Sequence, residues 1–258
     1  MNVALFGGTY DPIHLGHLAV ARAAAERFNL KQIHFVPAYI PPHKQKQAIS
    51  SFGHRYTMIS LATAGDPRFI PSLLESPDAI QRSGLDASYS FDTVRRMKSR
   101  LKKGDKLYFL IGMDAFADIA KWRNPVEVLR ECEFIVANRP GYSLADVVKS
   151  LPKELQPTAE GTRPIEREKP RGALKLEGAT IHLLEDVNEP VSSTEIRLAV
   201  GKRGQALELL VGDAVADYIR KLYLYKPTEP VQDEAGKQKS GLKDRGGLHV
   251  VGGREHQD

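Results

Sequence analysis

Short runs of apolar residues recur along the first 225 positions of the chain, separated by stretches with helical spacing. Such runs, when they end at glycine or proline, are typical of buried strands. The strands predicted in this way are Val3–Phe6, Ile33–Val36, a weaker Phe69–Ile70, Leu107–Ile111, Phe134–Ala137 and Ile181–Leu184.

Between these runs, apolar residues recur at spacings of three and four, which place them on one face of a helix. Strands that alternate with helices predict an α/β fold, a doubly wound Rossmann-like parallel sheet with helices on both faces. Ligands of such folds bind at the carboxyl-terminal edge of the sheet, so a functional motif should directly follow a strand. The predicted helices cover Leu18–Phe28, Arg55–Ala64, Phe91–Leu101, Val126–Arg130, Ser193–Val200 and Ala214–Leu222.

Two segments depart from this alternation. Residues 141–178 contain four prolines among many charges, which predicts a long charged insertion, partly helical near Leu144–Leu151. Residues 226–258 are rich in Gly, Lys and Gln and lack apolar periodicity, which predicts a disordered tail. One domain is therefore expected over residues 1–225, with the insertion inside it.

The formal net charge of +5 lies entirely in residues 1–225, because the tail balances six basic against six acidic residues. This excess fits ordinary solubility or an anionic ligand such as a polyphosphate. The single cysteine excludes an intramolecular disulfide and suits a reducing compartment. No signal-peptide pattern and no membrane-spanning apolar stretch are present, so a cytoplasmic protein without membrane contact is expected.

The segment Gly7–His17 directly follows the first predicted strand and opens the first helix. Its glycines, Gly7 and Gly8, allow the backbone to approach a ligand and to adopt positive φ. A helix that begins here directs unpaired N–H groups toward an anion. His14 and His17 lie three residues apart, on one side of the first turn, where both can donate hydrogen bonds. A tight turn with core histidines is the alternative, but the combination favours a phosphate site.

A second motif, Ser192–Arg197, has the spacing of a capping box, with Ser192 and Glu195 three residues apart. Many helices carry that device, but here the additional hydroxyls and Arg197 suit a second polyphosphate segment. A third motif, Pro41–Lys44, follows the second strand, and Lys44 offers a point charge. In isolation this third motif is better explained as a basic surface turn.

The pairing of Gly7–His17 with Ser192–Arg197 resembles the nucleotidyltransferase superfamily. Further landmarks narrow the resemblance to the bacterial nicotinate-nucleotide adenylyltransferases, over about residues 1–141 and 179–225. Three positions depart from that pattern: Tyr10 stands where Phe is frequent, Ser90 where Thr is frequent, and Arg123 where an aromatic residue is common. The landmarks, in order, are Pro41–Lys44, Ser88–Ser90 with Asp92–Thr93, Ile111–Asp114, Trp122 and Asn138–Gly141.

The resemblance implies transfer of AMP from ATP to nicotinate mononucleotide, giving deamido-NAD and pyrophosphate in NAD biosynthesis. It implies that catalysis rests on His14, His17, Lys44 and Arg197. The ATP-binding residues that it implies are Gly7, Gly8, Thr9, His14, His17, Asp114, Ser193, Thr194 and Arg197. The acceptor-binding residues are Lys44, Tyr89, Ser90, Trp122 and Arg139.

The chemistry of this reaction needs no general base, because the acceptor's phosphate is already largely ionised at neutral pH. No acid–base pair stands out among the motifs, in agreement. Mg²⁺ is implied as a cofactor held mainly by substrate phosphates, so no protein metal site is expected.

Other assignments stay open at this stage. One is a related adenylyl- or cytidylyltransferase, such as pantetheine-phosphate adenylyltransferase. Another is a non-enzymatic nucleotide- or RNA-binding module, although the basic residues between 163 and 175 are diluted by acidic ones and do not favour nucleic acid. A class I aminoacyl-tRNA synthetase is disfavoured by the absence of a Lys-Met-Ser-Lys-Ser segment. The sequence leaves the oligomeric state open.

Overall fold

The computed structural model describes residues 1–41, 48–137, 144–157, 172–185, 187, 191–200 and 206–225. The chain divides into two units, Met1–Lys226 and Pro227–Asp258, and all described residues belong to the first. Residues 158–171 of the predicted insertion and the whole predicted tail, 226–258, lie outside the described residues. The strands are β1 (Asn2–Gly8), β2 (Leu30–Pro37), β3 (Phe69–Pro71), β4 (Lys106–Gly112), β5 (Glu133–Ala137), β6 (Ala173–Leu176) and β7 (Ala179–Leu184).

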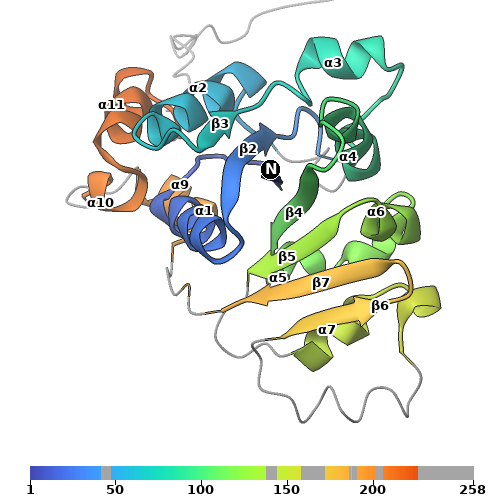
Figure 1. Ribbon diagram of the computed structural model, residues 1–258. Coiled ribbons are helices and arrows are strands. Elements are labelled where there is room, and N and C mark those ends of the chain that lie inside the picture. Colours follow the sequence, from blue (N-terminus) through green and yellow to red (C-terminus); the bar gives the residue numbers. More distant parts are fainter. Residues whose placement is uncertain are drawn as a thin grey trace, which may run out of the picture. The chain divides into compact units, whose positions relative to one another are not determined.

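These strands form one sheet in the order β3-β2-β1-β4-β5-β7-β6 (Figure 1). Every pair is parallel except β6 with β7. The order reverses its direction at β1, from which the chain first builds outward to β3 and then returns to add β4 on the other side. The helical elements are α1 (Leu15–Arg27), α2 (Phe52–Thr63), α3 (Pro77–Arg82), α4 (Ser90–Lys98), α5 (Met113–Phe116), η2 (Ile119–Lys121), α6 (Pro125–Glu131), α7 (Leu144–Ser150), η3 (Lys153–Leu155), α9 (Ser193–Ala199), α10 (Glu208–Val211) and α11 (Asp213–Lys221).

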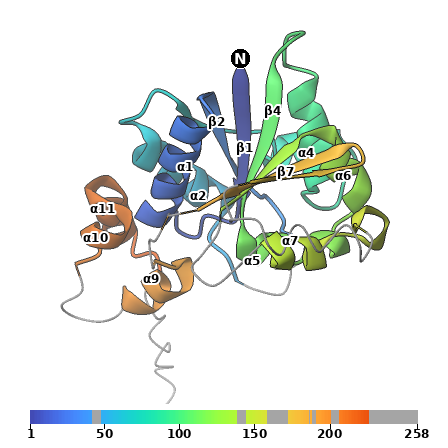
Figure 2. The ribbon, with the colours of Figure 1, turned by 60° about the horizontal axis from the view of Figure 1, so that its bottom comes forward.

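The sheet separates two apolar cores, because successive side chains of a strand point to opposite faces. Along β4, Phe109 enters one core and Leu110 the other. The first core is closed by α4, α5, α6 and α7, and the second by α1, α2, α9, α10 and α11. Figure 2 shows α1 and α2 on one side of the sheet and α4 and α6 on the other. The predicted α/β class with helices on both faces is confirmed.

The predicted long insertion over residues 141–178 has two described ends: the helical prediction near Leu144–Leu151 is confirmed, whereas the loop prediction for the carboxyl-terminal end is wrong. A helix, α7, occupies Leu144–Ser150, as the partial helical prediction allowed. At the other end, β6 pairs antiparallel with β7 through a tight turn at Gly178, which has φ +77°. The strand escaped notice because it is only four residues long and follows a proline-rich stretch. The short helices α3, α5 and α10, of four to six residues, were also not predicted.

The carboxyl ends of the parallel strands lie at one edge of the sheet. In Figure 2 the amino terminus marks one end of β1, while α5 and α9 lie beyond the other end. Both predicted phosphate motifs start at this second edge, since α1 follows β1 and α9 follows β7. Among the described residues, no helix is long and apolar enough to cross a membrane.

Candidate active site at the carboxyl edge of the sheet

The glycines of the first motif end β1 beside β2. Gly8 pairs with Pro37, and its carbonyl oxygen accepts a hydrogen bond from Ala38 N–H at 3.0 Å. A Cβ added to Gly8 would lie 3.0 Å from the ring of Tyr10, so a larger residue here would have to displace that buried ring slightly. Neither glycine uses the positive φ that its residue type allows; in this motif it is Tyr10 that does, with φ +53°. Its buried ring and a 2.7 Å hydrogen bond to the carbonyl of Phe6 offset that strain.

His14 and His17 lie together at the start of α1. Their rings are 3.7 Å apart between centroids, and His14 is the more buried of the two. The backbone N–H of His14 donates to Nδ1 of His17 at 3.3 Å. A neutral imidazole that accepts at Nδ1 carries its proton on Nε2. His17 is therefore set up to donate a hydrogen bond from Nε2, as binding to a phosphate oxygen requires.

The second motif packs directly against the first. At the start of α9 the predicted capping box is present, with Ser192 and Glu195 each bonded to the other's backbone N–H at 3.2 Å. The Ser193 hydroxyl donates to the carbonyl of Pro12 at 2.9 Å. Arg197 donates from Nη1 to the carbonyl of Asp11 at 2.7 Å. Two motifs that are about 180 residues apart in sequence thus meet at the Asp11–Pro12 segment.

A buried arginine that the sequence analysis missed connects the loops of this edge. Arg55, on α2, is only 1% exposed. Its guanidinium donates to the carbonyls of Thr9 and Ser50, both at 2.9 Å, and of Ala38 at 2.8 Å. Burial lowers the pKa of Arg55 from its usual value, and nearby Asp11 opposes that shift. One side chain thereby fixes the loop after β1 against the loop after β2.

A sequence signal for Arg55 did exist. It precedes Met58 and Ile59 by three and four residues, and both of these are fully buried. An arginine on the apolar face of a helix must find hydrogen-bond acceptors inside the protein. Asp11 is the second missed residue, since it lies within the motif but was given no role. It is 4% exposed, and its carboxylate accepts hydrogen bonds from Ser50 N–H and the Tyr225 hydroxyl.

The predicted acceptor residues that the structure describes, Tyr89, Ser90 and Trp122, lie around the start of α4. Tyr89 is the N-cap residue and Ser90 the first residue of this helix. The guanidinium of Arg123 lies 4.7 Å from the centroid of the Tyr89 ring, a cation–π contact that joins the two loops. Trp122, next to Arg123, packs edge-on against Phe109 at 5.9 Å. The structure thus brings the Tyr89 and Trp122 segments together.

The buried carboxylate of Glu75 links the start of α4 to the loop after β2. Glu75 accepts a 2.6 Å hydrogen bond from the Thr93 hydroxyl and a further one from Ser88. Ser88 in turn accepts the N–H of Tyr39, on the loop after β2. Burial raises the pKa of Glu75, and its hydrogen bonds and the charges of Arg96 and Arg55 only partly offset that rise. Sequence analysis missed Glu75 as well.

The remaining predicted residues have simpler outcomes. Asp114 is exposed at the first turn of α5, directly after β4, as a ribose-binding residue at this edge would be. Lys44 and Arg139 lie outside the described residues. Within the described ranges, no group of three or more His, Cys, Asp or Glu residues is placed to hold a metal ion.

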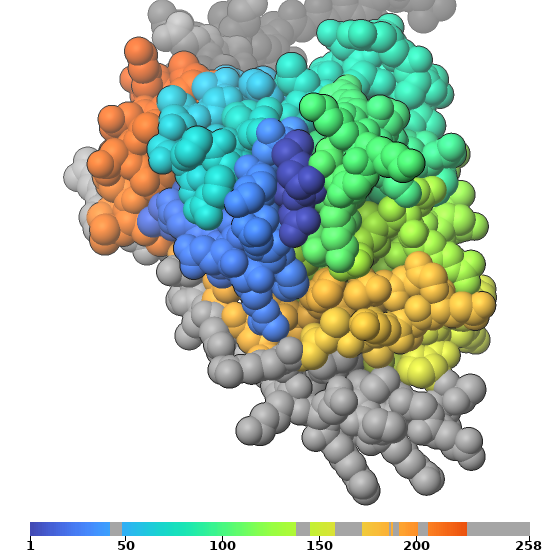
Figure 3. All heavy atoms as spheres, in the orientation of Figure 1, coloured from blue at the N-terminus to red at the C-terminus, as the bar shows by residue number. Residues whose placement is uncertain are grey.

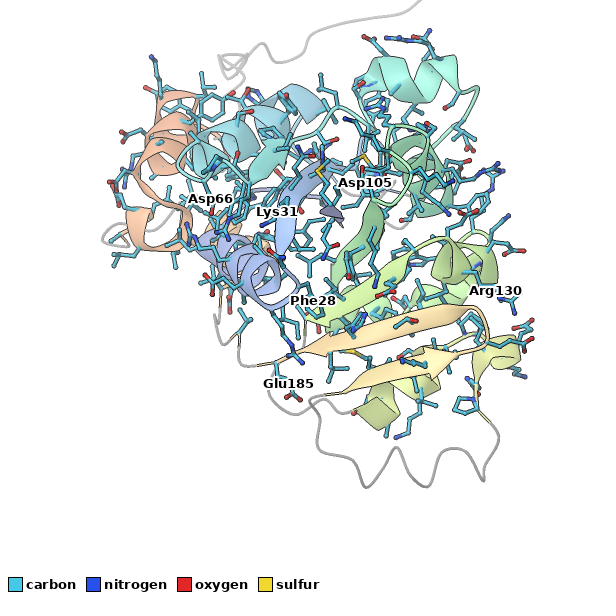
Figure 4. The ribbon with its side chains drawn as sticks, viewed as in Figure 1. Phe28, Lys31, Asp66, Asp105, Arg130 and Glu185 are labelled. Carbon is cyan, nitrogen blue, oxygen red and sulfur yellow. The ribbon has the colours of Figure 1, made fainter. Side chains whose placement is uncertain are left out.

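A cavity of about 510 Å³ lies at the opposite edge, where the strands begin. Figure 3 views the molecule from this side, and in Figure 4 Asp105 and Arg130 mark the start of β4 and the side of the β6–β7 turn. None of the motif residues lines this cavity. Its charged side chains pair across the surface, as Lys98 does with Glu131 and Lys106 with Glu133. We therefore place the candidate site at the carboxyl edge.

Comparison with known proteins identifies the family of the chain. The profile of the cytidylyltransferase-like family matches residues 5–199, which span both motifs. A "probable nicotinate-nucleotide adenylyltransferase" of Moorella thermoacetica is 38% identical over 227 residues, which cover 88% of this chain and 92% of the relative. One of the same name from Solibacter usitatus is 37% identical over 87% of this chain and its own whole length.

Solved structures share the fold. The nicotinic acid mononucleotide adenylyltransferase of Plasmodium falciparum complexed with NaAD superimposes with a TM-score of 0.63 and 19% identity, over 87% of this chain and 97% of that one. The same protein complexed with APC gives a TM-score of 0.62. The chain therefore belongs to the cytidylyltransferase-like family and, within it, to the nicotinate-nucleotide adenylyltransferases.

Proposed function

We propose that the protein transfers AMP from ATP to nicotinate mononucleotide, releasing pyrophosphate and forming deamido-NAD. One observation carries the proposal beyond family membership. The two phosphate motifs meet at Asp11–Pro12, at the carboxyl edge where an α/β sheet binds nucleotides. This convergence gathers His17, Arg197 and the start of α1 around one place, as a triphosphate substrate requires.

In the proposed reaction, a phosphate oxygen of the acceptor attacks the α-phosphorus of ATP. The new O–P bond forms as the bond from that phosphorus to the bridging oxygen of pyrophosphate breaks. The acceptor's phosphate has a second pKa of about 6, so it is already a nucleophile at neutral pH. No described residue is needed as a base, and catalysis rests on alignment and on stabilising the charge that pyrophosphate takes away.

His17 and Arg197 are suited to that second task. His17 presents Nε2–H, because its Nδ1 already accepts a hydrogen bond from the backbone. Arg197 has five N–H groups, of which the structure engages one with the carbonyl of Asp11 and one with the Thr194 hydroxyl. The others can bind phosphate oxygens while these two contacts hold the guanidinium in place. His14 and Lys44 are proposed to assist.

Divalent metal is general in nucleotidyltransferases of this kind, and we assign Mg²⁺ here. The described residues offer it no protein cage, and the one buried carboxylate of the first motif, Asp11, already has two donors. Mg²⁺ fits such a site because it commonly binds through substrate phosphates and water. When bound, it would supply charge neutralisation on the triphosphate. A cytoplasmic location is part of the same proposal.

Preference for the acid over its amide is expected from donor geometry. The first backbone N–H groups of α4, near Tyr89 and Ser90, have no acceptor within the helix, as in any first helical turn, and the N-cap side chain of Tyr89 does not cap them. Such donors satisfy both oxygens of a nicotinate carboxylate, whereas the NH₂ of nicotinamide would face one of them. Arg123, held beside Tyr89, adds positive charge, and Trp122 offers a ring for stacking.

The test is an acceptor panel with ATP and Mg²⁺, scored by pyrophosphate release. The panel contains nicotinate mononucleotide, nicotinamide mononucleotide and phosphopantetheine. We expect kcat/KM for the nicotinate compound to exceed that for the amide by roughly tenfold to a few hundredfold. Equal values would overturn the acceptor assignment and leave adenylyl transfer standing. Turnover of phosphopantetheine alone would assign the protein to another branch of the family. If no acceptor led to pyrophosphate release, the proposed enzymatic activity would be overturned.

A further inference from the structure

The buried carboxylate of Asp11 is held from two directions. Oδ2 accepts the backbone N–H of Ser50 at 3.2 Å, and Oδ1 accepts the hydroxyl of Tyr225 at 2.6 Å. The backbone carbonyl of the same residue accepts Nη1 of Arg197 at 2.7 Å. Asp11 therefore offers two kinds of acceptor, its charged carboxylate and its neutral backbone carbonyl. Arg197 bonds to the carbonyl, which is the weaker acceptor of the two.

Tyr225 reaches this site from the far end of the folded unit. It follows α11 by four residues and has φ +63°, a left-handed conformation that is uncommon for a residue with a bulky side chain. Its ring packs against the second core. Burial, followed by the charge of Asp11, raises the pKa of its hydroxyl, so Tyr225 stays a donor throughout the physiological range. Tyr225 thus adopts an uncommon backbone conformation at the position where its hydroxyl bonds to Oδ1 of Asp11.

A buried carboxylate that lacks a donor attracts the nearest cation. Arg197 is such a cation, because its guanidinium already touches Asp11, and it lies close enough to affect the pKa of Tyr225. Arg55 also acts on Asp11, but its N–H groups are committed to backbone carbonyls. Without the Tyr225 hydroxyl, Arg197 is thus the group that would move onto the carboxylate.

We propose that Tyr225 is a positioning residue that acts through Asp11: by occupying Oδ1, it keeps Arg197 on the carbonyl of Asp11 and available to the departing pyrophosphate. This inference rests on the proposed function, in which Arg197 contacts the pyrophosphate portion of ATP. Tyr225 itself touches no substrate in this account.

The first experiment compares Tyr225→Phe with Tyr218→Phe. Both remove one hydroxyl near the same helix, but the Tyr218 hydroxyl bonds to Nδ1 of His54 at 2.9 Å and not to Asp11. For Tyr225→Phe we expect kcat to fall about tenfold while KM for the acceptor changes less than twofold. Tyr218→Phe should keep both constants within about twofold of wild type. Circular dichroism fixes the folded fraction of each variant before the rates are compared.

A double-mutant cycle separates positioning from a merely structural role. In an Arg197→Ala background there is no guanidinium to misplace, so Tyr225→Phe should change kcat by less than about twofold. The same tenfold loss in both backgrounds would show that Tyr225 acts on stability or on another group, and would overturn the proposal.

A crystal structure of Tyr225→Phe provides a readout that needs no turnover. We expect the Arg197 guanidinium to contact Oδ1 of Asp11 in place of the carbonyl oxygen. A guanidinium that stays on the carbonyl would overturn the positioning role, even in an active enzyme. If the wild-type protein fails the acceptor panel, the proposed function falls, and this structure still decides how Tyr225 acts on Arg197.

Discussion

Both edges of the sheet carry charged side chains, but the carboxyl edge buries them, whereas the amino edge leaves them paired on the surface. At the carboxyl edge, Arg55 and Asp11 are at most 4% exposed, and the protein supplies partners for both from its loops. At the amino edge, Lys98 and Glu131 pair on the surface, with side chains 45% and 29% exposed. The cavity lies at the amino edge, whereas the motifs lie at the carboxyl edge.

The difference shows why a cavity lined by lysines is a weaker sign of function than buried charge. An exposed ion pair contributes little to stability, because water and salt screen it. A buried guanidinium, by contrast, is strongly destabilising unless its donors are satisfied, so its surroundings have to be built around it. The carboxyl edge contains such surroundings, which hold the phosphate motifs in a fixed geometry.

Replacing Arg55 with Met should have the largest effect on stability. The carbonyls of Thr9, Ser50 and Ala38 would lose their donor inside the protein, which costs about 3–5 kcal/mol of the free energy of unfolding. Urea denaturation measures the loss. Arg55→Lys retains the charge with fewer donors and should lie between Arg55→Met and wild type. A loss below about 1 kcal/mol for Arg55→Met would show that the loops hold together without it.

Replacing His17 or Arg197 with Ala should affect catalysis more than binding. Each substitution should lower kcat on the order of 10²-fold and change ATP affinity less, because both residues are proposed to contact charge that grows as pyrophosphate leaves. Steady-state kinetics with ATP and nicotinate mononucleotide measures both constants. His182→Ala, which removes a histidine paired with Glu133 at the amino edge, is the control and should leave kcat unchanged. An unchanged kcat with a raised KM in both site variants would contradict these roles.

The buried Glu75 should make stability depend on pH in a definite direction. Its pKa in the folded state is raised by burial, so the folded protein binds more protons than the unfolded chain once the pH exceeds the ordinary value of 4.5. Stability from this group therefore falls as the pH rises from 4.5 until the raised pKa is passed. Glu75→Gln should show a smaller loss of melting temperature over that range than wild type. Equal pH dependence of the two proteins would refute the burial argument, and Glu131→Gln, at a half-buried surface carboxylate, is the control.

The surface pair at the amino edge should give the smallest effect. Lys98→Met removes the partner of Glu131, and we expect the free energy of unfolding to change by less than about 1 kcal/mol, with kcat unaltered. The same urea titration as for Arg55→Met gives a direct comparison. A loss as large as that of Arg55→Met would mean that the contrast between the two edges is wrong.

The sequence predicted the functional chemistry well where residue type alone carries it. The two motifs, with their glycines, histidines, hydroxyls and Arg197, indicated a phosphate site, and the placement of both at the carboxyl edge followed from strand direction. The roles of the individual site residues stay predictions, and two of these residues, Lys44 and Arg139, lie outside the described residues. The boundary at residue 225 stays a prediction as well.

By itself, then, the sequence determined the parallel sheet, its helical layers and the two motifs, because apolar periodicity and motif chemistry are properties of neighbouring residues. Only the tertiary structure decided that Arg55 joins the loops after β1 and β2, that Tyr225 reaches Asp11 and that Glu75 is buried and bonded to Thr93. It also decided that Tyr10, rather than a glycine, takes the left-handed conformation. Each of these depends on which distant segments meet and on how much water their contact excludes, and no local pattern in the chain encodes either quantity.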